Sequence, residues 1–87
     1  MKVPEMIAEK IIALARLMTI AKYYNEDWKP DWNSQEYKHN IMRTSEYGII
    51  SSSDYNEGAI YFKNKEDAQA VIDNPNFRSI LDAIYKD

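Results

Sequence analysis

Residues 36–63, E-Y-K-H-N-I-M-R-T-S-E-Y-G-I-I-S-S-S-D-Y-N-E-G-A-I-Y-F-K, decide the fold of this chain. Ser45 and Glu46 make one tight connection, and D-Y-N-E-G at residues 54–58 is the clearest turn signal in the sequence. The segments between these connections are rich in residues that favour strands. The sequence therefore predicts strands over Glu36–Thr44, Tyr47–Ser52 and Ala59–Lys63, and we expect short loops to join them in an antiparallel meander.

Alternation along the first strand leaves two candidate core faces, because successive side chains point to opposite sides of a sheet. Ile41 favours the side that it shares with Tyr37, His39 and Arg43. In the third strand, Ile60 and Phe62 fall on one face. The opposite side of the first strand carries Lys38, Asn40, Met42 and Thr44.

Residues 4–24 predict a long helix before the sheet, with Pro4 in its first turn. Its apolar residues cover about half of the circumference, which is wider than the roughly 100° face of a one-sided helix. This helix is therefore either the central element of the fold or partly a protein-binding face, and in the second case we expect its surplus apolar face to act as a dimer seam. The two apolar stripes are Ile7, Ile11, Leu14, Met18 and Ala21, and beside them Met6, Ala13, Leu17, Ile20 and Tyr24.

Two further helical segments follow the strands. Asn64 is placed to cap the first, and the pair Asn74-Pro75 predicts that a new helical turn begins there. The chain is thus predicted to be one α+β domain over residues 1–87, ordered α-β-β-β-α. We expect a three-stranded antiparallel sheet with helices packed on one face and the last helix broken near Pro75.

The composition points away from enzymes and cofactor proteins. The 87 residues include no cysteine, so thiolate metal sites and disulfides are excluded, and only one histidine, without the partners that a catalytic triad or a zinc site needs. His39 lies inside a predicted strand, where a structural role is expected. Asp27 with Asp31, and Asp54 with Glu57, suit turns better than catalysis, and D-Y-N-E-G lacks the spacing of a calcium loop. We expect no enzyme activity, no metal, no cofactor and no small-molecule substrate.

The N-terminal sequence M-K-V-P-E-M does not have the pattern of a signal peptide, because a proline and a glutamate interrupt it. No window approaches the roughly 18 apolar residues that a membrane span needs. These features predict a cytoplasmic protein without membrane association.

Both tryptophans lie in the connector of residues 25–35, in the motif D-W-K-P-D-W at residues 27–32. Pro30 and Asp31 predict a type I turn that starts at Lys29. The aromatic rings of this region either close one end of the core or form a patch that binds a protein partner, since Trp and Tyr dominate interface hot spots. The candidate partner-binding residues are Tyr24, Trp28, Pro30, Asp31 and Trp32.

An alternative reading is a nucleic-acid-binding or regulatory module that uses the open face of the sheet. Lys38, Arg43 and Lys63 are its candidate contacts. The element order also matches that of double-stranded RNA-binding domains, but Glu66 and Asp67 occupy places where those domains put lysines. A formal charge of -3 argues further against binding to a polyanion.

The segment 15–32, A-R-L-M-T-I-A-K-Y-Y-N-E-D-W-K-P-D-W, resembles a helix-and-turn signature of small proteins from phages and mobile elements of gut anaerobes. Its distinctive part is W-x-P-D-W. Residues 37–58 depart from that group, so the resemblance assigns no site there and names no catalytic residue. It implies a bacterial cytoplasmic setting and an accessory or structural role. A second matching segment contains Tyr61, Phe62, Lys63, Asn64, Glu66 and Ala68.

Overall fold

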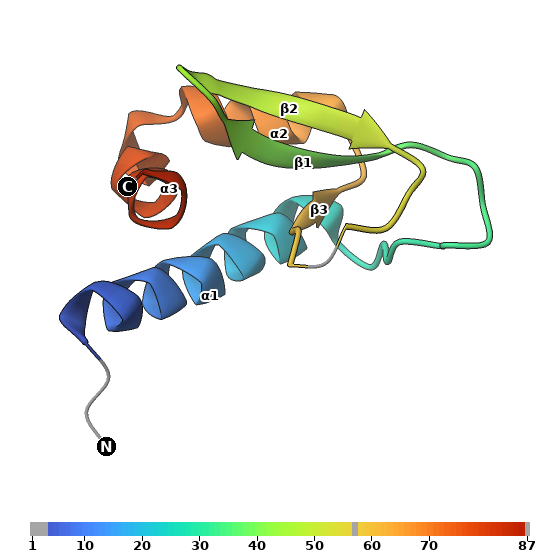
Figure 1. The fold of residues 1–87 in the computed structure, drawn as a ribbon. Helices are drawn as coiled ribbons and strands as arrows, with labels where there is room; N and C mark the ends of the chain where they lie inside the picture. Colours follow the sequence, from blue (N-terminus) through green and yellow to red (C-terminus); the bar gives the residue numbers. More distant parts are fainter. Residues whose placement is uncertain (1–3, 57, 87) are drawn as a thin grey trace.

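The structure, a computed structural model, describes residues 4–56 and 58–86 and confirms the predicted α+β class and element order (Figure 1). Helices and strands begin and end within a few residues of their predicted bounds, and a short 3-10 helix at Pro75 separates the last two helices as expected. The elements are α1 (Glu5–Asn25), β1 (Lys38–Arg43), β2 (Tyr47–Ser52), β3 (Tyr61–Phe62), α2 (Lys65–Asp73), η1 (Pro75–Phe77) and α3 (Arg78–Tyr85).

The strands do not form the expected meander. Their order in the sheet is β2-β1-β3, with β1 antiparallel to both neighbours. The expectation was wrong because the connection of residues 53–60 is no tight hairpin: it carries the chain from one side of β1 to the other. His39 consequently faces Ser51 on β2 and Phe62 on β3.

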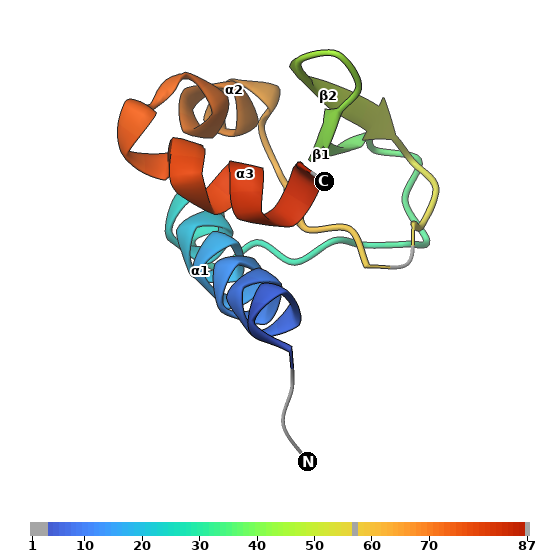
Figure 2. The ribbon, with the colours of Figure 1, turned by 60° about the vertical axis from the view of Figure 1, so that its left-hand side comes forward.

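One face of the sheet carries the core. Ile41 is 2% exposed and Phe62 is fully buried, which confirms that the side of the first strand with Ile41 points inward. Figure 2 shows the helices gathered on one side of the strands, as predicted. The buried cluster draws on all three α-helices and on β1 and β3, and its members are Ala13, Leu17, Ala21, Ile41, Phe62, Ala68, Val71, Ile72, Leu81 and Ile84.

Helix α1 contributes only part of each apolar stripe to this core: Ala21 of the first stripe is buried, and Met6 of the second is 79% exposed. Ala13 and Leu17 of the second stripe are buried, whereas Ile7, Ile11 and Met18 of the first stripe are 50%, 56% and 60% exposed. The N-terminal half of α1 also extends beyond the other elements (Figure 1). The predicted excess of apolar surface on this helix is therefore present on the folded molecule.

The C-terminal end of α1 protects the short strand β3. The side chain of Asn25 donates to the carbonyl of Tyr61 at 2.8 Å and accepts from the amide of Lys63 at 2.9 Å. A side-chain amide thus occupies the outer edge of β3, where a further strand would otherwise pair. Glu26, the next residue, has a positive φ of 55°.

Asparagines occupy the N-cap positions of both C-terminal helical segments, as the sequence predicts, but only Asn74 caps through its side chain. Asn64 stands before α2, and its side chain donates to Asp67 at 3.2 Å instead of accepting from the backbone. Asn74 accepts from the amide of Asn76 at 2.9 Å, which caps the turn that Pro75 begins. The break between α2 and α3 therefore follows from local sequence.

A candidate protein-binding surface

The connector between α1 and β1 folds through short-range hydrogen bonds. The amide of Trp28 donates to the carbonyl of Asn25 at 3.0 Å, and the amide of Ser34 donates to the carbonyl of Asp31 at 3.3 Å. The Asp31 carboxylate also accepts from the amide of Asn33 at 2.9 Å. The turn therefore starts at Asp31 and not at Lys29 as predicted, because the aspartate side chain organises the residues that follow it.

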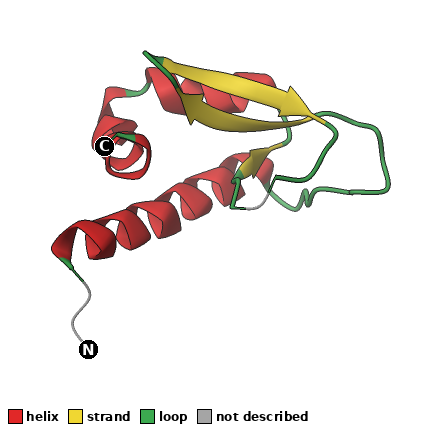
Figure 3. Ribbon diagram, viewed as in Figure 1, coloured by secondary structure: helices red, strands yellow, loops and turns green. Residues whose placement is uncertain are grey.

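Trp32 lies between two tyrosines that are distant in sequence. Its ring centroid is 5.3 Å from that of Tyr55, in the connection between β2 and β3, and 5.0 Å from that of Tyr61 in β3. Both pairs have edge-to-face geometry, which aromatic rings prefer. We call Trp32, Tyr55 and Tyr61 the aromatic rim. Figure 3 shows the two loops that supply Trp32 and Tyr55 at the same end of the sheet.

The aromatic rim covers a buried lysine. Lys38 is 1% exposed, and its ammonium lies 4.8 Å from the centroid of Trp32 and donates to the carbonyl of Ser34 at 3.2 Å. A cation over an indole ring is an attractive contact, and it is stronger where water is excluded. Trp32 thus shields Lys38 with its inner side and remains 40% exposed.

Beyond the rim, the sheet face opposite the helices is uncovered. Asn40, Met42 and Ile50, which we call the open face, line a hollow of about 430 Å³ together with Arg43, the connection before β3 and Tyr85 of α3, and Ile50 is 40% exposed. Tyr61 joins this hollow to the rim through Asn56, which lines the hollow. The Tyr61 hydroxyl accepts from the amide of Asn56 at 2.6 Å and donates to the carbonyl of the same residue at 3.2 Å. Rim and open face are therefore adjacent, and Asn40 lies between Tyr61 and Ile50 across the sheet.

The structure places the five predicted partner-binding residues in different environments. Asp31 and Trp32 are exposed, and Trp28 and Pro30 are half-buried. Tyr24 is also half-buried and packs against the core, so the outer aromatic at this point is its neighbour Tyr23, which is 79% exposed. Sequence reasoning missed Tyr55, Tyr61 and Ile50; alternation in the third strand placed Tyr61 opposite Phe62 and was the signal available for it.

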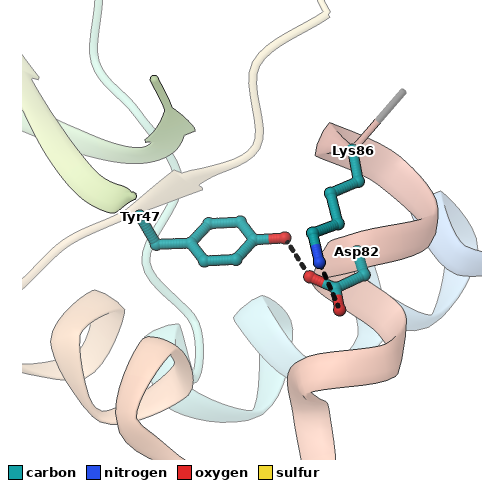
Figure 4. Close-up of polar contacts among 3 residues, drawn as sticks. All are labelled: Tyr47, Asp82 and Lys86. Carbon is teal, nitrogen blue, oxygen red and sulfur yellow. Dashed lines mark hydrogen bonds and ion pairs between the residues drawn. The ribbon is translucent and has the colours of Figure 1, made fainter. Parts of the chain in front are cut away.

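A second polar cluster ties β2 to α3 (Figure 4). The Tyr47 hydroxyl donates to the Asp82 carboxylate at 2.6 Å, and Lys86 approaches the same carboxylate at 3.8 Å. The guanidinium of Arg78 lies 5.0 Å from the centroid of the Tyr47 ring and also donates to the carbonyl of Ile72 at 3.0 Å. These contacts act as a structural clamp at the end of the sheet.

Burial is the main cause that raises the pKa of Tyr47 to about 12, and its hydrogen bond to Asp82 adds to the shift. The same hydrogen bond lowers the pKa of Asp82 below its usual value, with Lys86 and the arginines contributing. Burial also raises the pKa of Tyr85. At neutral pH the phenol is protonated and the carboxylate charged, as the clamp requires, and the shifts widen the pH range over which both states persist.

The three cations expected to line the open face do not gather there. Lys38 is buried under Trp32. Arg43 stacks on Tyr47 at 5.6 Å, on the face of β1 that points to the helices, and Lys63 follows β3. That expectation was wrong because Lys38 and Arg43 are an odd number of residues apart in one strand, which puts them on opposite faces.

His39 has a structural environment. Its Nδ1 atom lies 2.7 Å from the Ser51 hydroxyl across the β1–β2 pair. Among residues 4–56 and 58–86, no three histidine or acidic side chains come together as a metal site would require. Within the same residues, no helix combines the length and the apolar character that crossing a bilayer demands.

Comparison of the chain with protein-family models, with curated proteins and with solved structures finds no match in any of the three.

Proposed function

We propose that this chain is a non-enzymatic interaction protein, accessory to a phage or mobile element in the bacterial cytoplasm, that binds a protein partner or itself. The observation that carries the proposal is the exposure of Trp32, at 40%, between Tyr55 and Tyr61 and next to the open face. The resemblance of the W-x-P-D-W segment to small phage and mobile-element proteins supports the setting.

The aromatic rim has the properties of a binding hot spot. Trp and Tyr contribute most to interfaces when they are held rigidly and surrounded by other apolar groups. Trp32 is fixed by two aromatic edges and one ammonium group, so little side-chain freedom remains to be lost on binding. Tyr55, at 64% exposed, and Ile50, at 40%, add contact area to the rim and to the open face.

The alternative, a nucleic-acid-binding or regulatory module on the open face, has less support. Its expected cations are dispersed: Lys38 is buried and Lys63 follows β3, so that Arg43 alone of the three lines the hollow at the open face. A formal charge of -3 also opposes binding to phosphates. A gel-shift titration at low salt should show no shift, and a shift there would favour this alternative.

Site-specific photo-crosslinking in a bacterial host that carries the gene tests the proposal. A photoreactive phenylalanine analogue replaces Tyr55 on the rim in one variant and Gln69, on the exposed side of α2, in the control. We expect discrete crosslinks to another protein from position 55 and none from position 69. Equal patterns from the two positions, or no crosslink from position 55, would contradict binding through the rim.

Trp32→Ala separates a binding role from a structural one. With the crosslinker at position 55, the second substitution should remove the crosslinks while cooperative unfolding persists. Trp32→Phe is the matched control, because it keeps an aromatic ring at the same place and should retain part of the crosslinking. Loss of cooperative unfolding in Trp32→Ala would instead assign the ring to core closure alone.

A further inference from the structure

The outward side of α1, opposite its buried stripe, presents an unusually apolar surface for a solvent-facing helix. Ala8, Ile12, Ala15 and Thr19 step by four, three and four residues, which is the spacing of a coiled-coil seam. Ile12 is 52% exposed, and Ala15 and Thr19 are exposed. We call these four residues the outer seam. The exposed Ile11 and Met18 follow one of its flanks.

The outer seam is suited to close contact with another helix. Its alanines let two helix backbones approach closely, and its one polar side chain is already satisfied: the Thr19 hydroxyl donates to the carbonyl of Ala15 at 3.0 Å. Burial of Thr19 would therefore leave no hydroxyl without a partner, which is the usual cost of a polar residue at such a position.

A groove beside the outer seam enlarges the apolar surface. Phe77 and Ile80 of η1 and α3 form one wall of a hollow of about 520 Å³, and the other wall is formed by α1, with Ile12, Ala15, Arg16, Thr19 and Ile20. A helix laid along the outer seam would contact this groove at its edge. The area available for burial thus exceeds that of the seam residues alone.

Charge placement on α1 identifies the occupant and its direction. In heptad notation (abcdefg), Ile12 and Thr19 of the seam are a positions and Ala8 and Ala15 are d positions. Glu9 and Arg16 are exposed and follow the two d residues directly, so both are e positions. In an antiparallel pair of identical helices, e positions face e positions, so each Glu9 meets Arg16 of the other copy, twice by symmetry. Ile11 and Met18, at the g positions, meet each other in the same way. A parallel pair would instead place Ile11 against Arg16.

We infer that the outer seam of α1 packs antiparallel against α1 of a second copy of this chain, with reciprocal Glu9–Arg16 ion pairs fixing its register. The inference rests on the self-association included in the proposed function and gives it a surface and a geometry. It leaves the aromatic rim on a separate surface, so dimer formation and partner binding are separable.

Paired charge reversals test the geometry. Glu9→Arg makes both e positions basic and Arg16→Glu makes both acidic, so each variant alone should dimerise about tenfold more weakly or worse than the wild type. Mixed in equal amounts they should form a heterodimer, and the double variant E9R/R16E should regain the wild-type dimer. Light scattering and sedimentation over about 10–500 µM chain measure these masses.

Lys10→Glu is the matched control, because Lys10 is exposed on α1 but lies away from the outer seam. It should leave the dimer unchanged, and circular dichroism should show that all variants keep the wild-type fold. A monomeric wild type across the concentration range overturns the inference and leaves partner binding at the rim to its own crosslinking test. A dimer that neither reversal weakens, or reversals that fail to pair on mixing, would assign self-association to another surface and equally overturn it.

Discussion

The two faces of the sheet are stabilised by different kinds of interaction. On the helical face, Phe62 and Leu17 are fully buried and Ile41 nearly so, in a core assembled from all three α-helices. On the other face, Trp32 covers one end by stacking over Lys38, and the rest stays open around Ile50. The first face derives its stability from burial of apolar area, and the second depends on a few directional contacts.

This difference separates stability from binding on the molecule. A face packed to crystal-like density tolerates little change in volume, so it has no surface to offer a partner. The opposite face contributes less to folding and keeps aromatic and aliphatic groups in contact with water, where binding can bury them. The proposed partner surface lies where the fold has the least to lose.

The most direct test of this contrast compares the unfolding free energies of Phe62→Ala and Ile50→Ala. Removal of the fully buried ring should cost about 3–5 kcal/mol of unfolding free energy, because a cavity remains in the core. Ile50→Ala should cost under about 1 kcal/mol, since that side chain is already 40% exposed. Urea unfolding followed by circular dichroism measures both. Similar losses for the two variants would mean that the open face is as important to stability as the core.

Lys38 provides the next test, on the weaker face. Lys38→Ala should cost about 1–3 kcal/mol, because it removes buried methylene groups and leaves a space beneath Trp32. Lys38→Met keeps most of that volume and removes the buried ammonium, so its stability should stay within about 1 kcal/mol of the wild type. Thermal unfolding of the two variants compares them. A large loss in Lys38→Met would show that the ammonium group itself, through its contacts with Trp32 and Ser34, holds the Trp32 ring over the sheet.

The sequence predicted the elements better than their pairing. Periodicity located α1, and the caps at Asn64 and Asn74 located α2 and the break at Pro75, because these signals are local. The order β2-β1-β3 depends on where a two-residue strand finds a partner. That choice is made by tertiary contacts, such as those of Asn25 with the outer edge of β3, which no pattern within the strand encodes.

The candidate surface was predictable in part for the same reason. The motif around Trp32 was visible in the sequence, but the ring's neighbours come from segments far along the chain. Lys38 appeared as a surface cation because lysine is rarely buried, and only the stacked geometry accounts for its position. Tyr24 was named as a partner contact because the sequence alone does not show which of Tyr23 and Tyr24 points away from the core.

The Tyr47 clamp should show itself in the dependence of stability on pH. The phenol has a pKa of 10.0 when unfolded and about 12 when folded, so the unfolded chain ionises first and stability falls as pH rises between these values. The lowered pKa of Asp82 gives stability that is present above pH 3.8 and is lost as pH falls through the folded value.

Tyr47→Phe should remove the alkaline dependence and weaken the acid one, to which Lys86 and the arginines also contribute. It should cost about 1 kcal/mol at neutral pH, where the hydrogen bond to Asp82 is intact. Urea midpoints at about pH 3, 7 and 11 measure the difference from the wild type. Because Tyr85 also titrates with a raised pKa, the informative quantity at alkaline pH is the difference between the two proteins. A difference that is constant across all three pH values would contradict the clamp.

The smallest expected effect is at Glu26, which ends α1 and leads into the connector. Its φ of 55° and ψ of -116° lie in a region that residues with a side chain rarely adopt. Glu26→Gly should therefore stabilise the protein by up to about 1 kcal/mol, because relief of strain exceeds the entropy lost from a freer unfolded chain. Glu26→Ala is the control: it removes the same charge but keeps the Cβ atom, so it should give no gain. Equal stabilisation by both substitutions would trace the effect to the lost carboxylate and not to the backbone at the start of the aromatic connector.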